Sequence, residues 1–390
     1  MNDLDDSVKR ETATDTVRLS HYGDVAIIIP ARDEARRIHR ALTSIASLAC
    51  PISCRVHTVI VANNCQDQTA ERARNAMSDH HLSGKVICVD LPDTQGVGAA
   101  RQIGADYALH QLGAISAFLF TDADSCVDSQ WLARTLTHLE LVDVVCGQIM
   151  IDSQEAKQLP WVKTEWLEWE ALYLGLSLQL KTLMNPDGVN RWPHHGRVGG
   201  ASLAIRRSSF YRIGGFSDLL CGEDRDLVSR SLQHGMLVKY ADDVCVTTSG
   251  RLQGRAPGGM ADTLRARSLQ AEYVVDEMLE PAAVLLLRLH AQQECRRRWI
   301  QQQSMTPLNR LLCIDPRVTT HRPIPTCWQA VWASIERVSP LLAARRLYAH
   351  ELPKHIQSLE QALRNVNGSI SPPERSFQKL RSVLNSYSAH

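Results

Sequence analysis

Apolar runs in the first part of the chain alternate with segments whose apolar residues recur at helical spacing. The runs cover 25–29, 55–62 and 85–90, and the helical segments cover 33–45, 69–77 and 96–110. The first run is apolar at every position, which is typical of a strand buried on both faces of a sheet. Strand and helix in strict alternation predict a parallel sheet with right-handed crossovers. The fold class we expect is therefore α/β.

The alternation weakens after a further strand predicted over 143–151. The pattern then predicts helices over 161–180, 207–213 and 223–233, strands over 201–206 and 237–248, and loops over 184–200 and 250–259. Beyond about residue 285 the chain is mostly helical in pattern, and it carries 15 Lys and Arg against six Asp and Glu. We therefore expect a flexible leader over 1–23, one α/β domain over 24–280 and an appended helical region over 281–390.

Composition narrows the class of protein further. The chain has 390 residues and a net charge of +1, which gives no overall attraction to nucleic acid. Its 11 cysteines show no Cys-x-x-Cys spacing, so reduced thiols and a cytoplasmic location are the expectation. No run reaches the roughly 18 apolar residues that a membrane span needs. Peripheral contact with the inner face of a membrane stays open.

Two carboxylates follow the apolar run Ala117–Phe120, in the sequence Thr-Asp-Ala-Asp-Ser. Asp122 and Asp124 are two residues apart, so at the end of a strand they are expected to point to the same side. The carboxyl ends of the strands are where open α/β sheets bind ligands. Paired carboxylates there suit Mg²⁺ or Mn²⁺ together with the phosphates of a substrate. Short acidic pairs also end strands without any ligand.

Several motifs occur in a fixed order around this pair. They are Ile29-Pro-Ala-Arg-Asp-Glu34, Asn63-Asn-Cys-Gln-Asp67, Gly96–Arg101, Asp122-Ala-Asp124, Gly199–Arg206, Gly214-Gly-Phe216 and Gly222-Glu-Asp224. This ordered set, from Val25 to Leu264, resembles the inverting family 2 glycosyltransferases of the GT-A fold. The resemblance implies a Rossmann-like, mostly parallel mixed sheet between helices.

The resemblance also implies roles for the acidic residues. Asp124, and with it Asp122, would hold the divalent ion, and Asp122 would also contact the nucleotide. Asp224 matches the family's general base, and Glu223 would orient the acceptor or the helix that carries Asp224. The alternative for Asp224 is structural, because acidic residues in the first turn of a helix are favoured by the helix dipole.

The resemblance places a nucleotide against the first two predicted strands. Pro30, Ala31 and Glu34 match the family's first nucleotide-binding turn, although Glu34 equally suits a helix start. Asn63 and Asn64 stand where the family usually has acidic residues, so the identity of the base is open. Asp67 is expected to cap the helix that begins at Thr69.

The remaining candidates are basic residues, glycine and histidine. Arg101 matches an Ala-Arg pair of the family and would reach the nucleotide, unless it is a solvated helix residue. Arg251 and Arg255 lie in a glycine-bearing loop that is expected to close over a diphosphate or to be a surface turn. Gly200 belongs to the substrate-binding motif. His194 and His195 lie in the predicted acceptor-side loop, as polar contacts or plain loop residues.

The hypothesis is thus a metal-dependent inverting glycosyltransferase that uses a nucleotide-sugar donor and a glycan, a lipid-linked molecule or a small molecule as acceptor. A sugar nucleotidyltransferase is the nearest rival, but Ala31-Arg-Asp-Glu34 lacks the glycines that such an enzyme carries after its first strand. A catalytically silent scaffold of a glycan-assembly complex is the alternative from another class. The three acidic positions Asp122, Asp124 and Asp224 disfavour it.

Overall fold

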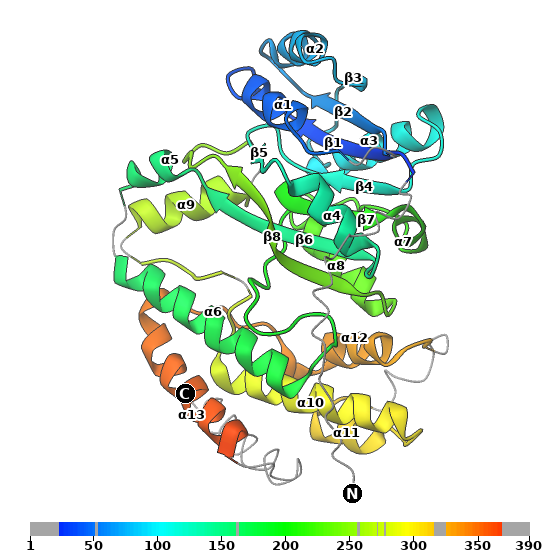
Figure 1. Ribbon diagram of the computed structural model, residues 1–390. Coiled ribbons are helices and arrows are strands. Elements are labelled where there is room, and N and C mark those ends of the chain that lie inside the picture. Colours follow the sequence, from blue (N-terminus) through cyan, green and yellow to red (C-terminus); the bar gives the residue numbers. More distant parts are fainter. Residues whose placement is uncertain are drawn as a thin grey trace, which may run out of the picture.

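The computed structural model describes residues 23–50, 54–160, 164–255, 258–270, 272–276, 278–315 and 325–368. The predicted leader lies almost entirely outside these ranges, as does the end of the chain after 368. A mixed sheet with helices on both faces forms one part of the molecule, and a group of helices forms the other (Figure 1).

Eight strands form the sheet in the order β3-β2-β1-β4-β7-β6-β8-β5. The bounds are β1 Val25–Ala31, β2 Val56–Asn63, β3 Gly84–Val89, β4 Ala117–Phe120, β5 Cys126–Val127, β6 Val144–Ile151, β7 Leu203–Arg206 and β8 Val238–Thr248. Strands β3, β2, β1 and β4 are parallel, β7 is antiparallel to both of its neighbours, and β6 is parallel to β8. The predicted α/β class with a mixed sheet is confirmed.

Two layers of helices bury the two faces of this sheet. One core cluster joins Ile27 and Ile29 of β1 to α1, α2 and α4, and the opposite cluster joins Ala26 and Ile28 to α3, α7 and α8. Successive side chains of a strand point to opposite faces, so burial on both faces explains why β1 is apolar throughout. The bounds are α1 Ile38–Ala46, α2 Thr69–Asp79, α3 Val97–Gln111, α4 Trp131–Leu139, α7 Arg207–Arg212 and α8 Glu223–Gln233.

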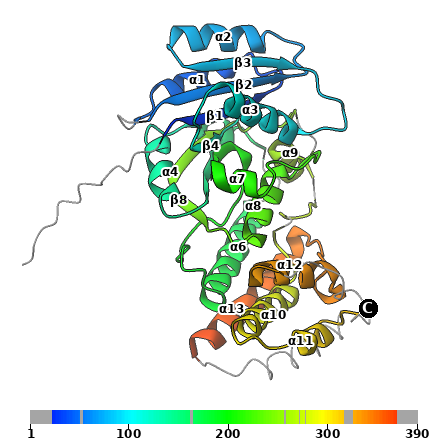
Figure 2. The ribbon, with the colours of Figure 1, turned by 90° about the vertical axis from the view of Figure 1, so that its right-hand side faces the viewer.

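A second unit of helices lies to one side of the sheet (Figures 1 and 2). Its bounds are α6 Thr164–Met184, α10 Ala282–Ile300, α11 Thr306–Leu311, α12 Trp328–Val338 and α13 Leu352–Gly368. Two apolar clusters hold it together, one joining α6, α10 and α13 and the other joining α10, α11 and α12. The predicted helical region after residue 281 is present, and it shares its core with α6, which comes from within the predicted α/β domain.

The helical unit also contacts the base of the sheet layer. Helix α12 packs against α8, and the Cys327 thiol donates to the carbonyl of Gln233 at the end of α8. Two further helices, α5 Ser153–Lys157 and α9 Met260–Leu269, lie after β6 and after the 250–259 loop. Among the described residues no helix combines the length and the apolar character that crossing a bilayer requires.

Candidate active site

The two aspartates of the acidic pair lie just beyond the carboxyl end of β4. The strand ends at Phe120, so Asp122 and Asp124 occupy the following turn, which the hydrogen bond from Ser125 N to Asp122 O closes. The side chain of Asp122 is 34% exposed and that of Asp124 is 11% exposed. The sequence therefore located the pair correctly, although a turn and not the strand itself aims the two carboxylates.

A buried arginine joins Asp122 to the start of α8. Arg101 on α3 donates from Nη2 to Asp122 Oδ1 at 2.7 Å and is ion-paired through Nη1 with Glu223. Its side chain is only 3% exposed, so the solvated alternative is wrong. Close packing defines its place, because a Cβ on Gly200 would overlap the Arg101 guanidinium.

Asp224 faces the same space from the first turn of α8. Its Oδ2 accepts a hydrogen bond from the backbone N–H of Gly200 at 2.8 Å, and its Oδ1 accepts one from Arg225 N at 2.7 Å. Its neighbour Glu223 is buried, and burial raises the pKa of Glu223 while the Arg101 guanidinium opposes that shift. Asp226 is committed elsewhere, since it accepts from Ser217 and Arg230. Asp224 thus differs from its acidic neighbours Glu223 and Asp226, because both of its hydrogen bonds come from backbone N–H groups and neither comes from an arginine.

A second arginine reaches the site from the loop after β8. Arg251 is ion-paired with the buried Glu34 and also lies 3.2 Å from Asp124 Oδ2, through Nη2. Burial raises the pKa of Glu34, and Arg251 opposes that shift. Arg255 in the same loop donates to the backbone carbonyl of Asp33 at 3.1 Å. Both loop arginines therefore lie over the carboxyl end of β1.

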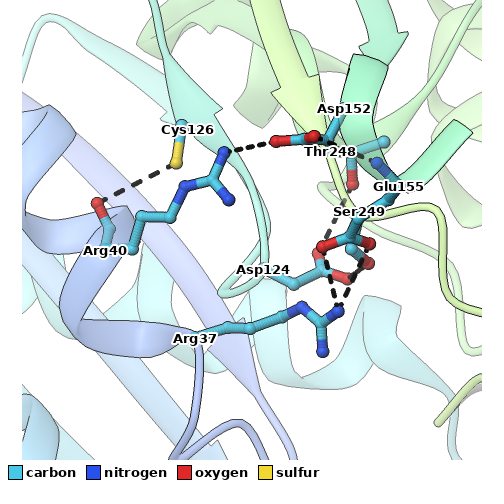
Figure 3. Close-up of a pocket in the computed structure, with 8 residues that line it drawn as sticks. All are labelled: Arg37, Arg40, Asp124, Cys126, Asp152, Glu155, Thr248 and Ser249. Carbon is cyan, nitrogen blue, oxygen red and sulfur yellow. Dashed lines mark hydrogen bonds and ion pairs between the residues drawn. The ribbon is translucent and has the colours of Figure 1, made fainter. Parts of the chain in front are cut away.

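A small pocket lies beside Asp124, and residues around it connect this loop to the sheet layer (Figure 3). Ser249 Oγ donates to Asp124 Oδ2 at 2.5 Å, and Gly250 N donates to Glu155 Oε2 at 2.7 Å. Glu155 of α5 is in turn ion-paired with Arg37, at 3.2 Å. The two residues before Arg251 are thereby each held by a hydrogen bond to a carboxylate. The residues that line the pocket are Arg37, Arg40, Asp124, Cys126, Asp152, Glu155, Thr248 and Ser249.

The turns after β1 and β2 are also built largely from internal contacts. The side chain of Asn64 exchanges two hydrogen bonds with the backbone of Leu91, at 2.8 and 3.1 Å. Asp67 Oδ1 accepts from Thr69 N, the first residue of α2, at 2.9 Å, although Gln68 and not Asp67 occupies the capping position. Pro30 and Ala31 are buried at the end of β1, and Asn63 is half-buried at the end of β2.

Asp33, Cys65 and Asp67 place three ligand-type atoms within 4.8 Å of one another. The two carboxylates, however, accept backbone N–H groups of the same turn, from Gln66 and Thr69. These contacts account for the cluster as part of the loop structure. It carries no metal assignment.

The two histidines of the 184–200 loop are engaged within the protein. The ring of His194 stacks on Tyr240 with a centroid distance of 5.4 Å, and His195 Nε2 lies 3.1 Å from the carbonyl oxygen of Cys146. Burial lowers the pKa of both imidazoles. Asp224 acts electrostatically on the Cys146 thiol, so this loop lies on the Asp224 side of the site.

The side chains at this edge have the composition of a divalent-cation site. Five carboxylates converge there, Glu34, Asp122, Asp124, Glu223 and Asp224, and they outnumber the arginines Arg101, Arg251 and Arg255 at the same edge. Hard oxygen ligands in excess over local positive charge suit Mg²⁺ or Mn²⁺. Asp122 and Asp124 fit such an ion, because both are partly exposed and neither is enclosed on all sides.

Comparison with known proteins identifies the class. Residues 26–214 match the family model "Glycosyl transferase family 2". This part of the chain is a family 2 glycosyltransferase domain, and the match includes Asp122, Asp124 and Gly200. Glu223 and Asp224 lie beyond its end.

Two curated relatives agree with the family match. Glycosyltransferase AglE of Haloferax volcanii is 34% identical over 127 residues, which is 32% of this chain and 39% of the relative. The probable glycosyltransferase YdaM of Bacillus subtilis is 23% identical over 219 residues, or 55% of this chain and 48% of the relative. The alignments thus span less than half the length of each relative.

Solved structures with a detectable likeness include two glycosyltransferases. The mannosyltransferase PcManGT from Pyrobaculum calidifontis, in complex with GDP-Man and Mn²⁺, is 16% identical with a TM-score of 0.45, covering 94% of this chain and 79% of that one. Residues 1–349 of TarS from S. aureus, in complex with UDP-GlcNAc, are 15% identical with a TM-score of 0.44, covering 87% and 91%.

Proposed function

We propose that this protein is a metal-dependent inverting glycosyltransferase that moves a sugar from a nucleoside-diphosphate sugar to an acceptor hydroxyl. The observation that supports it best is the excess of carboxylates over arginines around the carboxyl end of β4, where Asp122 and Asp124 belong to the family 2 match. Open α/β sheets bind their ligands at this edge. A diphosphate brings further negative charge to it, so the pair Asp122 and Asp124 needs a divalent ion to accept such a ligand.

In this proposal Asp224 is the general base. Its carboxylate takes the proton of the acceptor hydroxyl while the acceptor oxygen bonds to the anomeric carbon and the bond from that carbon to the diphosphate oxygen breaks. One carboxylate opposite the leaving group gives a single displacement with inversion. The hydrogen bond from Gly200 N orients Oδ2, and the Arg101–Glu223 ion pair fixes the helix turn that carries Asp224.

The bound ion would neutralise the charge that develops on the departing diphosphate. Asp124 and Asp122 would hold it, while Arg251 and Arg255 lie close enough to the same edge to contact phosphate oxygens. Pro30, Ala31 and Asn63 remain the proposed contacts to the nucleotide. The donor sugar and base are open, as is the acceptor, whether glycan, lipid-linked or small.

The proposed cytoplasmic location, with peripheral contact to a membrane open, rests on the thiols. All 11 cysteines lie among the described residues and none forms a disulfide. Reduced cysteines are typical of a cytoplasmic protein.

The direct test is a panel of UDP- and GDP-sugars assayed for thermal stabilisation and for slow donor hydrolysis, with Mn²⁺ and with EDTA. We expect one nucleotide class to stabilise the protein and to be hydrolysed only with the metal. Formation of a nucleoside triphosphate-dependent product would favour a nucleotidyltransferase instead. Binding without any turnover, in the presence of candidate acceptors, would favour a silent scaffold.

A further inference from the structure

The two arginines of the site form matching bridges. Arg101 joins Asp122 to the buried Glu223, and Arg251 joins Asp124 to the buried Glu34. Each aspartate of the acidic pair therefore shares one guanidinium with a buried glutamate. The two bridges differ in exposure: the Arg101 side chain is 3% exposed, and that of Arg251 is 20% exposed.

The partners of Asp124 all come from one short segment. Thr248 Oγ1 lies 3.5 Å from Oδ1, Ser249 Oγ donates to Oδ2 at 2.5 Å, and Arg251 Nη2 lies 3.2 Å from the same Oδ2. The positive charge of Arg251 lies beside Oδ2, whereas Oδ1 faces only a hydroxyl. A divalent ion that used Oδ2, or both oxygens, would have to share the carboxylate with the guanidinium, and two cations at one carboxylate repel each other.

Of the three side chains that contact Asp124, that of Arg251 is partly exposed, whereas Thr248 and Ser249 are buried. The backbone at 249–250 is held by Asp124 and by Glu155, and Glu155 is held by Arg37. An exchange at Asp124 therefore needs rotation of one partly exposed side chain and no rearrangement of the loop. A diphosphate offers Arg251 a new anionic partner of matching geometry.

We propose that Arg251 and the divalent ion compete for Asp124, so that the metal binds tightly only when a diphosphate arrives to receive the guanidinium. The proposal rests on the proposed function and adds an order to it: the ion and the diphosphate bind as coupled ligands. Linkage requires the coupling to be reciprocal, so the metal must raise nucleotide affinity by the factor by which the nucleotide raises metal affinity. Free enzyme would then carry little metal.

The test counts free Mn²⁺ by electron paramagnetic resonance, with Mn²⁺ alone and then with UDP or GDP. For the parent protein we expect weak binding of Mn²⁺ alone, and a gain of about 5- to 150-fold with the nucleotide that fits, the usual range of coupling between two ligands. Arg251→Gln removes the competing cation. It should bind Mn²⁺ alone about tenfold or more tightly than the parent, and the gain from the nucleotide should shrink.

Arg265→Gln is the matched control. It removes an exposed arginine of α9 that pairs with Asp262 and not with a carboxylate of the site. In this variant, the affinity for Mn²⁺ without nucleotide should equal that of the parent protein. A folded Arg251→Gln protein that binds Mn²⁺ alone no more tightly than the parent would overturn the competition.

That failure is distinguishable from failure of the proposed function. If the parent protein and Arg251→Gln both fail to bind Mn²⁺, with and without UDP or GDP, the metal assignment itself is wrong. The competition then falls with it. If the parent binds Mn²⁺ with a nucleotide but Arg251→Gln gains nothing without it, the metal site stands and only the competition is wrong.

Discussion

Two networks of arginine and carboxylate in this molecule look alike and differ in charge balance. In the helical unit Arg288 donates to Glu280 and to the carbonyl of Leu342 and is ion-paired with Glu336. Lys181 lies within electrostatic range of the same three charged groups. Two carboxylates there face two cations, so the charges of this network balance.

The charges of the network at the sheet edge do not balance. Among the described residues its five carboxylates outnumber the three arginines at this edge, Arg101, Arg251 and Arg255, and Asp122 remains 34% exposed. Desolvated charge of one sign is costly unless a counter-ion is present. A balanced network therefore stabilises a fold, and an unbalanced one at the carboxyl ends of strands indicates a site that is completed by a ligand. The predictions below test this distinction from the largest expected effect to the smallest.

The largest effect is expected at the proposed base. Asp224→Asn keeps an oxygen for the Gly200 N–H but lacks the carboxylate that takes a proton. Turnover should fall by about 10²- to 10⁴-fold, with little change in donor affinity. Steady-state kinetics and nucleotide titration on one preparation measure both.

A structural role for Asp224 predicts the opposite pattern. Thermal stability would then drop while turnover stayed within a few-fold of the parent. Asp226→Asn is the matched control from the same turn, since Asp226 is paired with Ser217 and Arg230. It should lower stability and retain most of the turnover.

A substitution in the balanced network of the helical unit should change the stability of the protein and not its ligand binding. Arg288→Met removes the cation that is ion-paired with Glu280 and Glu336 and leaves Lys181 as the second cation of the network. Because Glu336 is 38% exposed, water compensates part of the loss, and we expect the free energy of unfolding to fall by about 2 kcal/mol. Chemical denaturation measures this change.

Nucleotide affinity of Arg288→Met should equal that of the parent protein. Arg297→Met is the control on the same helix, where the arginine is 41% exposed and pairs with Glu294. It should cost less than about 0.5 kcal/mol. A loss of nucleotide affinity in Arg288→Met, with the fold intact, would show that the two networks are not independent.

The smallest effect concerns pH. Burial lowers the pKa of His194, so the unfolded chain binds a proton that the folded protein does not. Stability should therefore begin to fall as the pH drops below about 6.5, the pKa of His in the unfolded chain. It should keep falling until the pH has passed the lower pKa of the folded protein. His194→Phe keeps a ring against Tyr240 and should reduce this loss, by less than about 1 kcal/mol per pH unit.

Denaturation at several pH values between 7 and 5 measures the slope. A slope that is the same in His194→Phe and in the parent would mean that the imidazole is as accessible to protons in the folded protein as in the unfolded chain.

The sequence predicted most elements of the sheet layer because their burial is one-sided or complete. The strand expected over 25–29 extends to Ala31, and the helix expected over 223–233 has those bounds. The contact of Asp67 with the start of α2 was predicted from local chemistry alone, since its partner Thr69 is two residues away.

Partners that are distant in the chain were beyond prediction. Arg101 meets Asp122 and Glu223 across 21 and 122 residues, and no local pattern encodes such a meeting. Helix α6 was predicted as a helix, but apolar residues occur around much of its circumference. Its sequence therefore did not indicate which face is buried, nor that this face packs on α10 and α13. The boundary at residue 280 stays a prediction.

The hydrogen bonds from Ser249 to Asp124 and from Gly200 N to Asp224 were likewise missed. The one available signal was Gly199-Gly200 before a strand, because adjacent glycines often mark a close approach of backbone to another group.

The measurement that tests the central claim most directly is calorimetric titration of the donor's nucleoside diphosphate with Mn²⁺ and with EDTA, on the parent protein and on Asp124→Asn. The substitution retains an oxygen for the Ser249 hydroxyl but removes one negative charge from the unbalanced network. Asp128→Asn is the control, because Asp128 is an exposed carboxylate that lies 3.8 Å from Arg134. We predict that Mn²⁺ increases nucleotide affinity in the parent and in Asp128→Asn and has no effect in Asp124→Asn. An equal effect of Mn²⁺ in all three proteins would contradict the account.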